Sequence, residues 1–158
     1  MTVLSLVISC NNGKKSVETR ESVFDHAGLL TVPQKDTIAA LISNLEKEIG
    51  SQIAIFTIDS LGGENINEFS LRTAEKLRLG RAEFDDGILI SVAVFNKAMR
   101  IEVGYGLEKI IGDEIAARIL REDMAPRFRE KDYNGGIKVT VEKIIQLIED
   151  NQELIGQR

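Results

Sequence analysis

The stretch Phe84-Asp85-Asp86-Gly87-Ile88-Leu89-Ile90-Ser91-Val92-Ala93-Val94 decides how this chain folds. Its residues 87–94 form a nearly unbroken apolar run of strand length, which is typical of a strand covered on both faces. Residues 98–103 follow, with apolar and charged side chains in alternation, the pattern of a half-buried strand. The segment between the two runs is short enough for an antiparallel hairpin.

A hairpin of this kind brings the start of its first strand beside the end of its second strand. We therefore expect Asp85 and Asp86 to lie near the segment Gly104-Tyr105-Gly106-Leu107-Glu108. Carboxylates and a glycine-rich turn would then meet at one end of the sheet.

Apolar periodicity predicts the other elements. Residues 53–58 are apolar enough for a second buried strand. Helices are expected over 34–49 and from Ile66 to a stop at Gly80. Because a helix joins strand 53–58 to strand 87–94, a right-handed crossover should make those two strands parallel. The chain is therefore an α/β protein whose small sheet is mixed.

The C-terminal third is predicted to be helical. A helix should begin with Asp113 as its N-cap and be broken or kinked at Pro126, which lacks an amide donor. Residues 132–136 have the composition of a loop, and an amphipathic helix follows from Ile137.

Composition narrows the class of protein. The chain has 158 residues, of which 43% are apolar and 28% charged, and a formal charge of −5, so we expect one globular domain. No basic patch with interleaved aromatic residues is present, so nucleic acid is not an expected partner. The single cysteine excludes an intrachain disulfide and a cysteine-based zinc site. The single histidine argues against a histidine-rich zinc or iron centre.

The first residues suggest export. Residues 1–9 are apolar but too short to span a bilayer, and Val7-Ile8-Ser9-Cys10 resembles the bacterial lipobox, in which a cysteine becomes lipid-modified. We expect residues 1–20 to be a signal-like segment and tether, with Cys10 as the lipidation site. No Lys or Arg precedes the apolar stretch, which departs from the signal-peptide pattern. The alternative is a buried first strand whose cysteine has no special role.

Four carboxylates are candidate metal ligands: Asp25, Asp85, Asp86 and Glu108. Carboxylates that converge without an interleaved Lys or Arg repel one another, and a hard divalent cation is their natural counter-charge. Oxygen ligands favour Ca²⁺ or Mg²⁺ over softer metals. The alternative is that the aspartates are solvated loop residues and that Glu108 pairs with a neighbouring base.

Two further residues are weaker candidates. His26 lies beside Asp25 and could form an acid–base pair, but no serine or cysteine nucleophile accompanies it, so a surface or capping histidine is favoured. Tyr105 could stack on a ligand or pack under the hairpin. The chain has no phosphate loop, dinucleotide fingerprint or nucleophile elbow.

Four ordered motifs resemble the TPM domain. They are Phe24-Asp25-His26-Ala27-Gly28-Leu29-Leu30, Asp85-Asp86-Gly87-Ile88-Leu89-Ile90, Arg100-Ile101-Glu102-Val103-Gly104-Tyr105-Gly106-Leu107-Glu108 and Asp132-Tyr133-Asn134-Gly135-Gly136-Ile137. The resemblance implies a three-layer α/β/α sandwich around a small mixed β-sheet over residues 21–155, with the antiparallel hairpin at 87–94 and 98–103. It also implies binding of a divalent metal, chiefly calcium with Mg²⁺ as the alternative, at the four carboxylates above.

The expected function follows from the residues themselves and from the resemblance to the TPM domain. We expect an exported, periplasmic or outer-membrane-tethered lipoprotein that binds a divalent cation and assists an unidentified envelope protein, with membrane contact only through its N-terminal lipid. The alternative is a metal-dependent acid phosphatase, an activity proposed for the family. Against that alternative, the D-x-D-x-[TV] arrangement of aspartyl phosphatases is missing, and Asp85 and Asp86 begin a strand instead of ending one.

Overall fold

A four-stranded sheet lies at the centre of the molecule. The computed structural model describes residues 20–157, and in them the strands have the spatial order β1 (Val23–Asp25), β2 (Gln52–Ile58), β3 (Gly87–Ala93) and β4 (Ala98–Val103). Strands β1, β2 and β3 are parallel, and β4 pairs with β3 in the antiparallel sense. This confirms the predicted mixed sheet, its hairpin and its parallel crossover.

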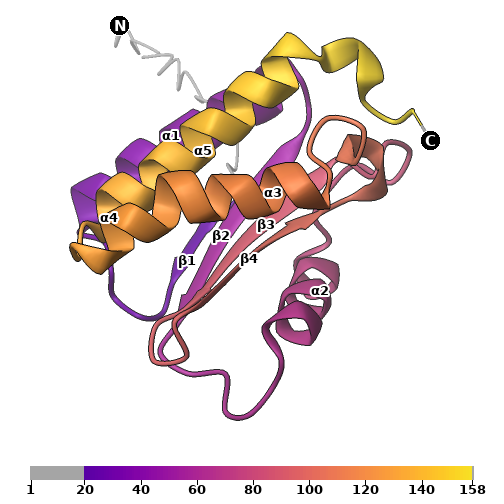
Figure 1. Ribbon diagram of the computed structural model, residues 1–158. Helices are drawn as coiled ribbons and strands as arrows, with labels where there is room; N and C mark the ends of the chain where they lie inside the picture. Colours follow the sequence, from indigo (N-terminus) through magenta and orange to yellow (C-terminus); the bar gives the residue numbers. More distant parts are fainter. Residues whose placement is uncertain (1–19, 158) are drawn as a thin grey trace, which may run out of the picture.

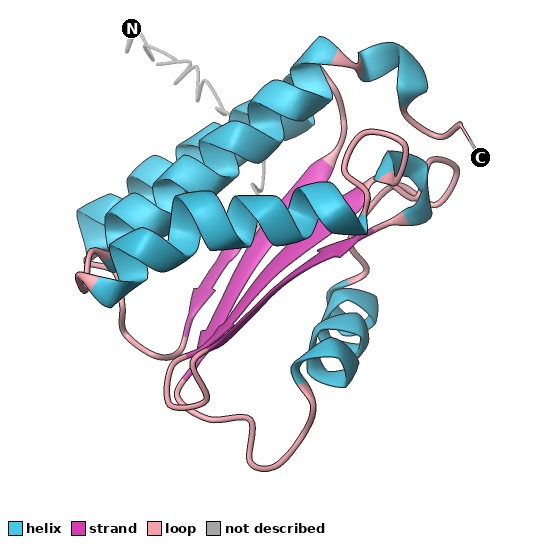
Figure 2. Cartoon of the chain, in the orientation of Figure 1, coloured by secondary structure: helices cyan, strands magenta, loops and turns pink. Residues whose placement is uncertain are grey.

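Helices cover both faces of the sheet (Figure 1). Helices α1 (Val32–Glu48), α3 (Asp113–Ile119), α4 (Ala125–Arg129) and α5 (Tyr133–Asp150) lie on one face, and α2 (Ile66–Leu77) lies alone on the other. Figure 2 shows the helices in cyan on either side of the magenta strands, with loops gathered at the two ends of the sheet. The chain is therefore a three-layer α/β/α sandwich.

The core explains the nearly unbroken apolar run at residues 87–94. Every residue of β3 is buried, because the helix layer covers one face of this strand and α2 covers the other. Ile55, Ile88 and Ile90 belong to the cluster on the side of the helix layer, together with Ile38 and Ile144 of α1 and α5. Burial of this kind is worth about 2 kcal/mol for each large aliphatic side chain, so β3 carries much of the stabilisation.

Strand β1 was not predicted. Val23, Phe24 and Asp25 pair with Ile55, Phe56 and Thr57 of β2. A strand of three residues at a sheet edge has too little periodicity to be separated from a turn by pattern alone.

The boundaries of the C-terminal helices differ from the prediction in two places. Helix α3 is capped by Gly112, so Asp113 is its first residue and not its N-cap. Helix α5 begins at Tyr133, inside the segment predicted as a loop, because the Asp132 carboxylate accepts a hydrogen bond from the Gly135 amide at 2.9 Å. Gly136 suits this place because a Cβ there would lie 2.6 Å from the Phe128 ring.

Pro126 does not end the helix in which it lies. A π-helical turn, η2 (Leu120–Met124), follows α3 directly, and α4 continues from Ala125 with the proline in its first turn. Proline is tolerated in a first turn because its missing amide would have no helical partner there. Within residues 20–157, every helix is too short or too polar to cross a membrane.

The segment after β4 passes directly over the backbone that precedes β3. The Gly104 amide donates to the Gly87 carbonyl at 2.8 Å, and the Gly106 amide donates to the Asp85 carbonyl at 3.0 Å. A Cβ at Gly106 would overlap the carbonyl oxygen of Phe84. The glycines are therefore required by the close approach of two backbones.

We expect Gly106→Ala to lower the free energy of unfolding by about 3 kcal/mol, because one of the two backbones must move. Urea denaturation followed by circular dichroism measures this. The matched control is Gly112→Ala, since its Cβ would lie 3.3 Å from its nearest neighbour, the Glu108 carbonyl oxygen, and we expect it to cost no more than about 1 kcal/mol. Equal costs for the two variants would contradict the close-approach argument.

Candidate functional site

A cavity of about 740 Å³ lies at the end of the sheet where β3 begins and β4 ends. Its walls come from α2, from β4 and from the segments on either side of the hairpin. Its charged lining residues are the carboxylates Glu75, Asp85, Glu102, Glu108 and Asp113 and the arginines Arg78 and Arg100. Carboxylates outnumber arginines here, so the cavity is acidic.

The hairpin brings Asp85 and Glu108 to this cavity, as predicted. Asp85 has the positive φ of 51°, which an aspartate tolerates better than most residues. Its amide donates to the Arg81 carbonyl at 2.8 Å, and its own carbonyl accepts from Gly106, so its backbone is held from both sides. Glu108 is exposed and directly follows the short helical turn η1 (Tyr105–Leu107).

Asp86 is buried and bonded within the protein, contrary to its prediction as a metal ligand at an open site. Its side chain has no exposed surface. It accepts hydrogen bonds from the Arg81 amide (2.8 Å), from Arg81 Nε (2.9 Å) and Nη2 (2.5 Å), and from Ser51 Oγ (3.1 Å). The premise that no Lys or Arg is interleaved was wrong, because Arg81 supplies the counter-charge.

Asp25 lies at the opposite end of the sheet, contrary to the prediction that it joins the other carboxylates. It pairs with Thr57, which pairs with Val92, six residues beyond Asp86 along β3. At about 3.3 Å per residue this is a separation of about 20 Å, too far for a shared ion. The Asp25 carboxylate instead accepts hydrogen bonds from the Leu29 amide (3.0 Å), the Leu30 amide (2.9 Å) and Thr57 Oγ1 (2.5 Å).

Among residues 20–157, no three His, Cys, Asp or Glu side chains are close enough together to hold one metal ion. His26 is exposed and its ring lies 4.9 Å from the Phe56 ring, in agreement with the surface histidine that was favoured. Tyr105 is 70% exposed and lines the cavity, so it does not pack under the hairpin. Cys10 lies outside the described residues.

Sequence reasoning missed several charged residues of the cavity, among them Arg78, Arg100 and Glu102. Arg100 and Glu102 form an ion pair at 3.0 Å, and their alternation along β4 already places them on one face. Arg78 ends α2 with the positive φ of 50°. The signal that could have pointed to Arg78 is a charged residue at a helix end, in a position that glycine more often occupies.

The fold and the cavity define an α/β/α domain with an acidic cavity at the open end of its hairpin. The sequence profile of the TPM domain matches residues 23–147, and this chain belongs to that family. None of the curated protein sequences compared with the chain is similar enough to count as a match.

Solved structures support the same fold. The N-terminal domain of a P. gingivalis protein is 26% identical, with a TM-score of 0.79 over 87% of each chain. The BA42 protein of Bizionia argentinensis is 19% identical, with a TM-score of 0.66 over 77% of this chain and 82% of its own. The N-terminal domain of a Corynebacterium glutamicum protein is 12% identical, with a TM-score of 0.64 over 92% of this chain and 86% of its own.

We expect Asp86→Asn to lower the free energy of unfolding by about 3 kcal/mol, because it leaves Arg81 without its counter-charge. This is the low end of the cost of breaking a buried pair, since the Arg81 side chain is 35% exposed. Asp85→Asn is the neighbouring control and should cost less than about 1 kcal/mol, because asparagine also tolerates positive φ. Chemical denaturation of both variants tests this, and a harmless Asp86→Asn would show that Asp86 is not a structural anchor.

Proposed function

We propose that the acidic cavity at the hairpin end binds a divalent cation, Ca²⁺ in preference to Mg²⁺, with Asp85 and Glu108 as ligands. The observation that carries this proposal is that both line one cavity at the open end of the hairpin, Asp85 just before β3 and Glu108 shortly after β4. Asp25 and Asp86 are not part of the proposed site, since their carboxylates serve the fold.

The charge of the cavity supports a cation. Five carboxylates line it against two arginines, and one of these arginines, Arg100, is already paired with Glu102. Carboxylates crowded in this way repel one another, and a bound divalent ion would relieve that repulsion. Oxygen donors suit Ca²⁺, which tolerates irregular coordination geometry better than Mg²⁺ does.

Binding should be weak. In the arrangement observed within residues 20–157, no three carboxylates converge, so the ion would keep water molecules among its ligands. A dissociation constant of about 10⁻⁴–10⁻³ M, typical of extracellular calcium modules, fits such a site. Millimolar calcium outside the cell would be enough to occupy it.

We further propose that the domain is an accessory module of the cell envelope, tethered by a lipid on Cys10 and acting on a protein partner. The support for export and tethering is the lipobox-like Val7-Ile8-Ser9-Cys10 and the polar residues that follow it.

The test is a melting curve in EDTA and in 10 mM CaCl₂ or MgCl₂. At about ten times the weaker dissociation constant, calcium should stabilise the domain by about 1.4 kcal/mol and raise the melting temperature by a few degrees, more than magnesium does. The double variant Asp85→Asn/Glu108→Gln should lose this rise and should be no less stable than the parent in EDTA.

The matched control is Glu48→Gln/Glu149→Gln, which removes the same charge at exposed positions of α1 and α5. This control should keep the calcium shift. Equal melting temperatures in EDTA and calcium would overturn the proposal, and so would a full shift in the Asp85/Glu108 variant.

An acid phosphatase is the second candidate, favoured by one observation. Arg78 and Arg100 line the same cavity as the carboxylates, and arginines are suited to holding a phosphate. We expect purified protein to hydrolyse p-nitrophenyl phosphate only slowly with Ca²⁺ or Mg²⁺, and Asp85→Asn to leave that rate unchanged. A loss of about 10²-fold in folded Asp85→Asn would instead establish an enzyme. Asp86→Asn is unsuitable for this test because it disturbs the fold.

A further inference from the structure

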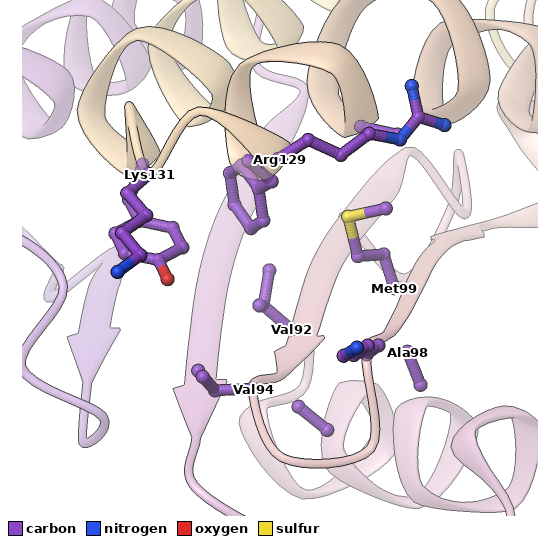
Figure 3. Close-up of a pocket in the computed structure, with 11 residues that line it drawn as sticks. Val92, Val94, Ala98, Met99, Arg129 and Lys131 are labelled. Atoms are coloured by element: carbon purple, nitrogen blue, oxygen red, sulfur yellow. The ribbon is translucent and has the colours of Figure 1, made fainter.

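A second cavity, of about 650 Å³, lies at the other end of the hairpin, between the turn that joins β3 to β4 and helix α4 (Figure 3). Its volume is within the range of pockets that enclose small molecules, about 300–1,000 Å³. Apolar side chains from both sides form its walls, among them Val92 and Val94 of the β3 end, Met99 of β4 and Phe128 of α4.

Three cations border these apolar walls, and no carboxylate does. They are Lys97 in the hairpin turn, Arg129 at the end of α4 and Lys131 just after it. Figure 3 shows Arg129 and Lys131 on the helical side of the cavity, with side chains that run in opposite directions, and Val92 and Met99 on the strand side. None of the three makes an ion pair with any residue between 20 and 157.

The two lysines occupy backbone positions that favour glycine. Lys97 has a φ of 49° and Lys131 a φ of 61°. Lys131 follows helix α4 in the left-handed conformation that glycine usually supplies, with its amide donating to the Phe128 carbonyl at 3.0 Å. Long charged side chains at two such positions, both on one cavity, are not explained by the backbone.

The cavity also lies where ligands commonly bind. It is at the carboxyl end of β3, whose neighbours β2 and β4 run in opposite directions. Open α/β sheets commonly bind ligands outside the carboxyl ends of their parallel strands. The π-helical turn η2, which directly precedes α4, is of a kind often found near functional sites.

We propose that this cavity binds a small amphipathic anion: one negatively charged group on an aliphatic body. The apolar walls would take the aliphatic part, and Lys97, Arg129 and Lys131 would hold the anionic group by charge-assisted hydrogen bonds. The concave shape, with cations only around it, fits a single dissolved molecule. Because the net charge of the chain is −5, long-range electrostatics would not attract an anion. The preference for an anionic ligand must therefore come from the three cations at the cavity.

The probe is decanoate, added to the ¹⁵N-labelled protein in EDTA and followed by NMR. Amide shifts should move around Val94, Lys97 and Lys131 and should leave Glu108 unaffected. Decan-1-ol, which lacks the charge, and decyltrimethylammonium, which reverses it, should bind at least about tenfold more weakly. EDTA makes the result independent of the proposed cation site.

The decisive variant is Lys97→Gly/Lys131→Gly, because glycine suits both backbone positions and the fold should be kept. We expect an unchanged or higher melting temperature and an affinity for decanoate lowered by at least about tenfold. Arg129→Gln, at an exposed position, should weaken binding in the same direction. The matched control, Lys47→Gln/Lys143→Gln, removes two exposed lysines of α1 and α5 and should bind decanoate as the parent does.

Three outcomes would overturn the proposal. They are equal affinity for decanoate and decan-1-ol, full affinity in the folded double glycine variant, and binding only to anionic lipid vesicles with no response to monomeric decanoate. The first would leave an apolar groove without charge selection, and the last would indicate a membrane surface.

Discussion

The buried contact between Asp86 and Arg81 holds the centre of this fold together. Asp86 has no exposed surface and accepts three hydrogen bonds from the backbone and side chain of Arg81. It also accepts from Ser51, just before β2, and its carbonyl accepts from the Gln52 amide at 3.0 Å. One carboxylate thus joins the end of the α2 connection to the starts of both central strands, and the register of β2 against β3 depends on it.

The hairpin places two cavities of opposite charge at its two ends. The cavity at the start of β3 is lined mainly by carboxylates, and the one at its end is bordered only by cations. Strand β3 has seven residues and is therefore about 20 Å long, which exceeds the screening length of about 8 Å at physiological ionic strength. The charge of one cavity is therefore largely screened at the other, although the chain as a whole is acidic.

Much of this architecture could be predicted because strong periodicity carries it. The helix expected from Ile66 to a stop at Gly80 is found at 66–77, and the hairpin expected at 87–94 and 98–103 is observed at 87–93 and 98–103. The convergence of Asp85 and Glu108 followed from the hairpin alone. What failed was the placing of Asp25, and the cause was β1: a parallel strand ending at Asp25 puts that residue at the carboxyl edge, opposite to Asp86.

The basic cavity could not be predicted, because its parts have no common signal in the sequence. Lys97 and Lys131 are separated along the chain and become neighbours of one cavity only when α4 packs over the end of β3. Their positive φ values are likewise a property of the folded backbone. A lysine in a turn is usually solvated, so sequence alone favours that interpretation.

Three aspartates in the motifs that resemble the TPM domain have carboxylates that fix turns. Asp25, Asp86 and Asp132 each accept hydrogen bonds from backbone amides a few residues away, and so each fixes a turn that begins or ends an element. A carboxylate used in this way is already satisfied and gains little from a metal ion. The backbone of Asp85 is held by hydrogen bonds with the backbones of Arg81 and Gly106. The residue also lines the acidic cavity. Motif membership therefore includes positions whose carboxylates fix turns and one position, Asp85, that lines the acidic cavity.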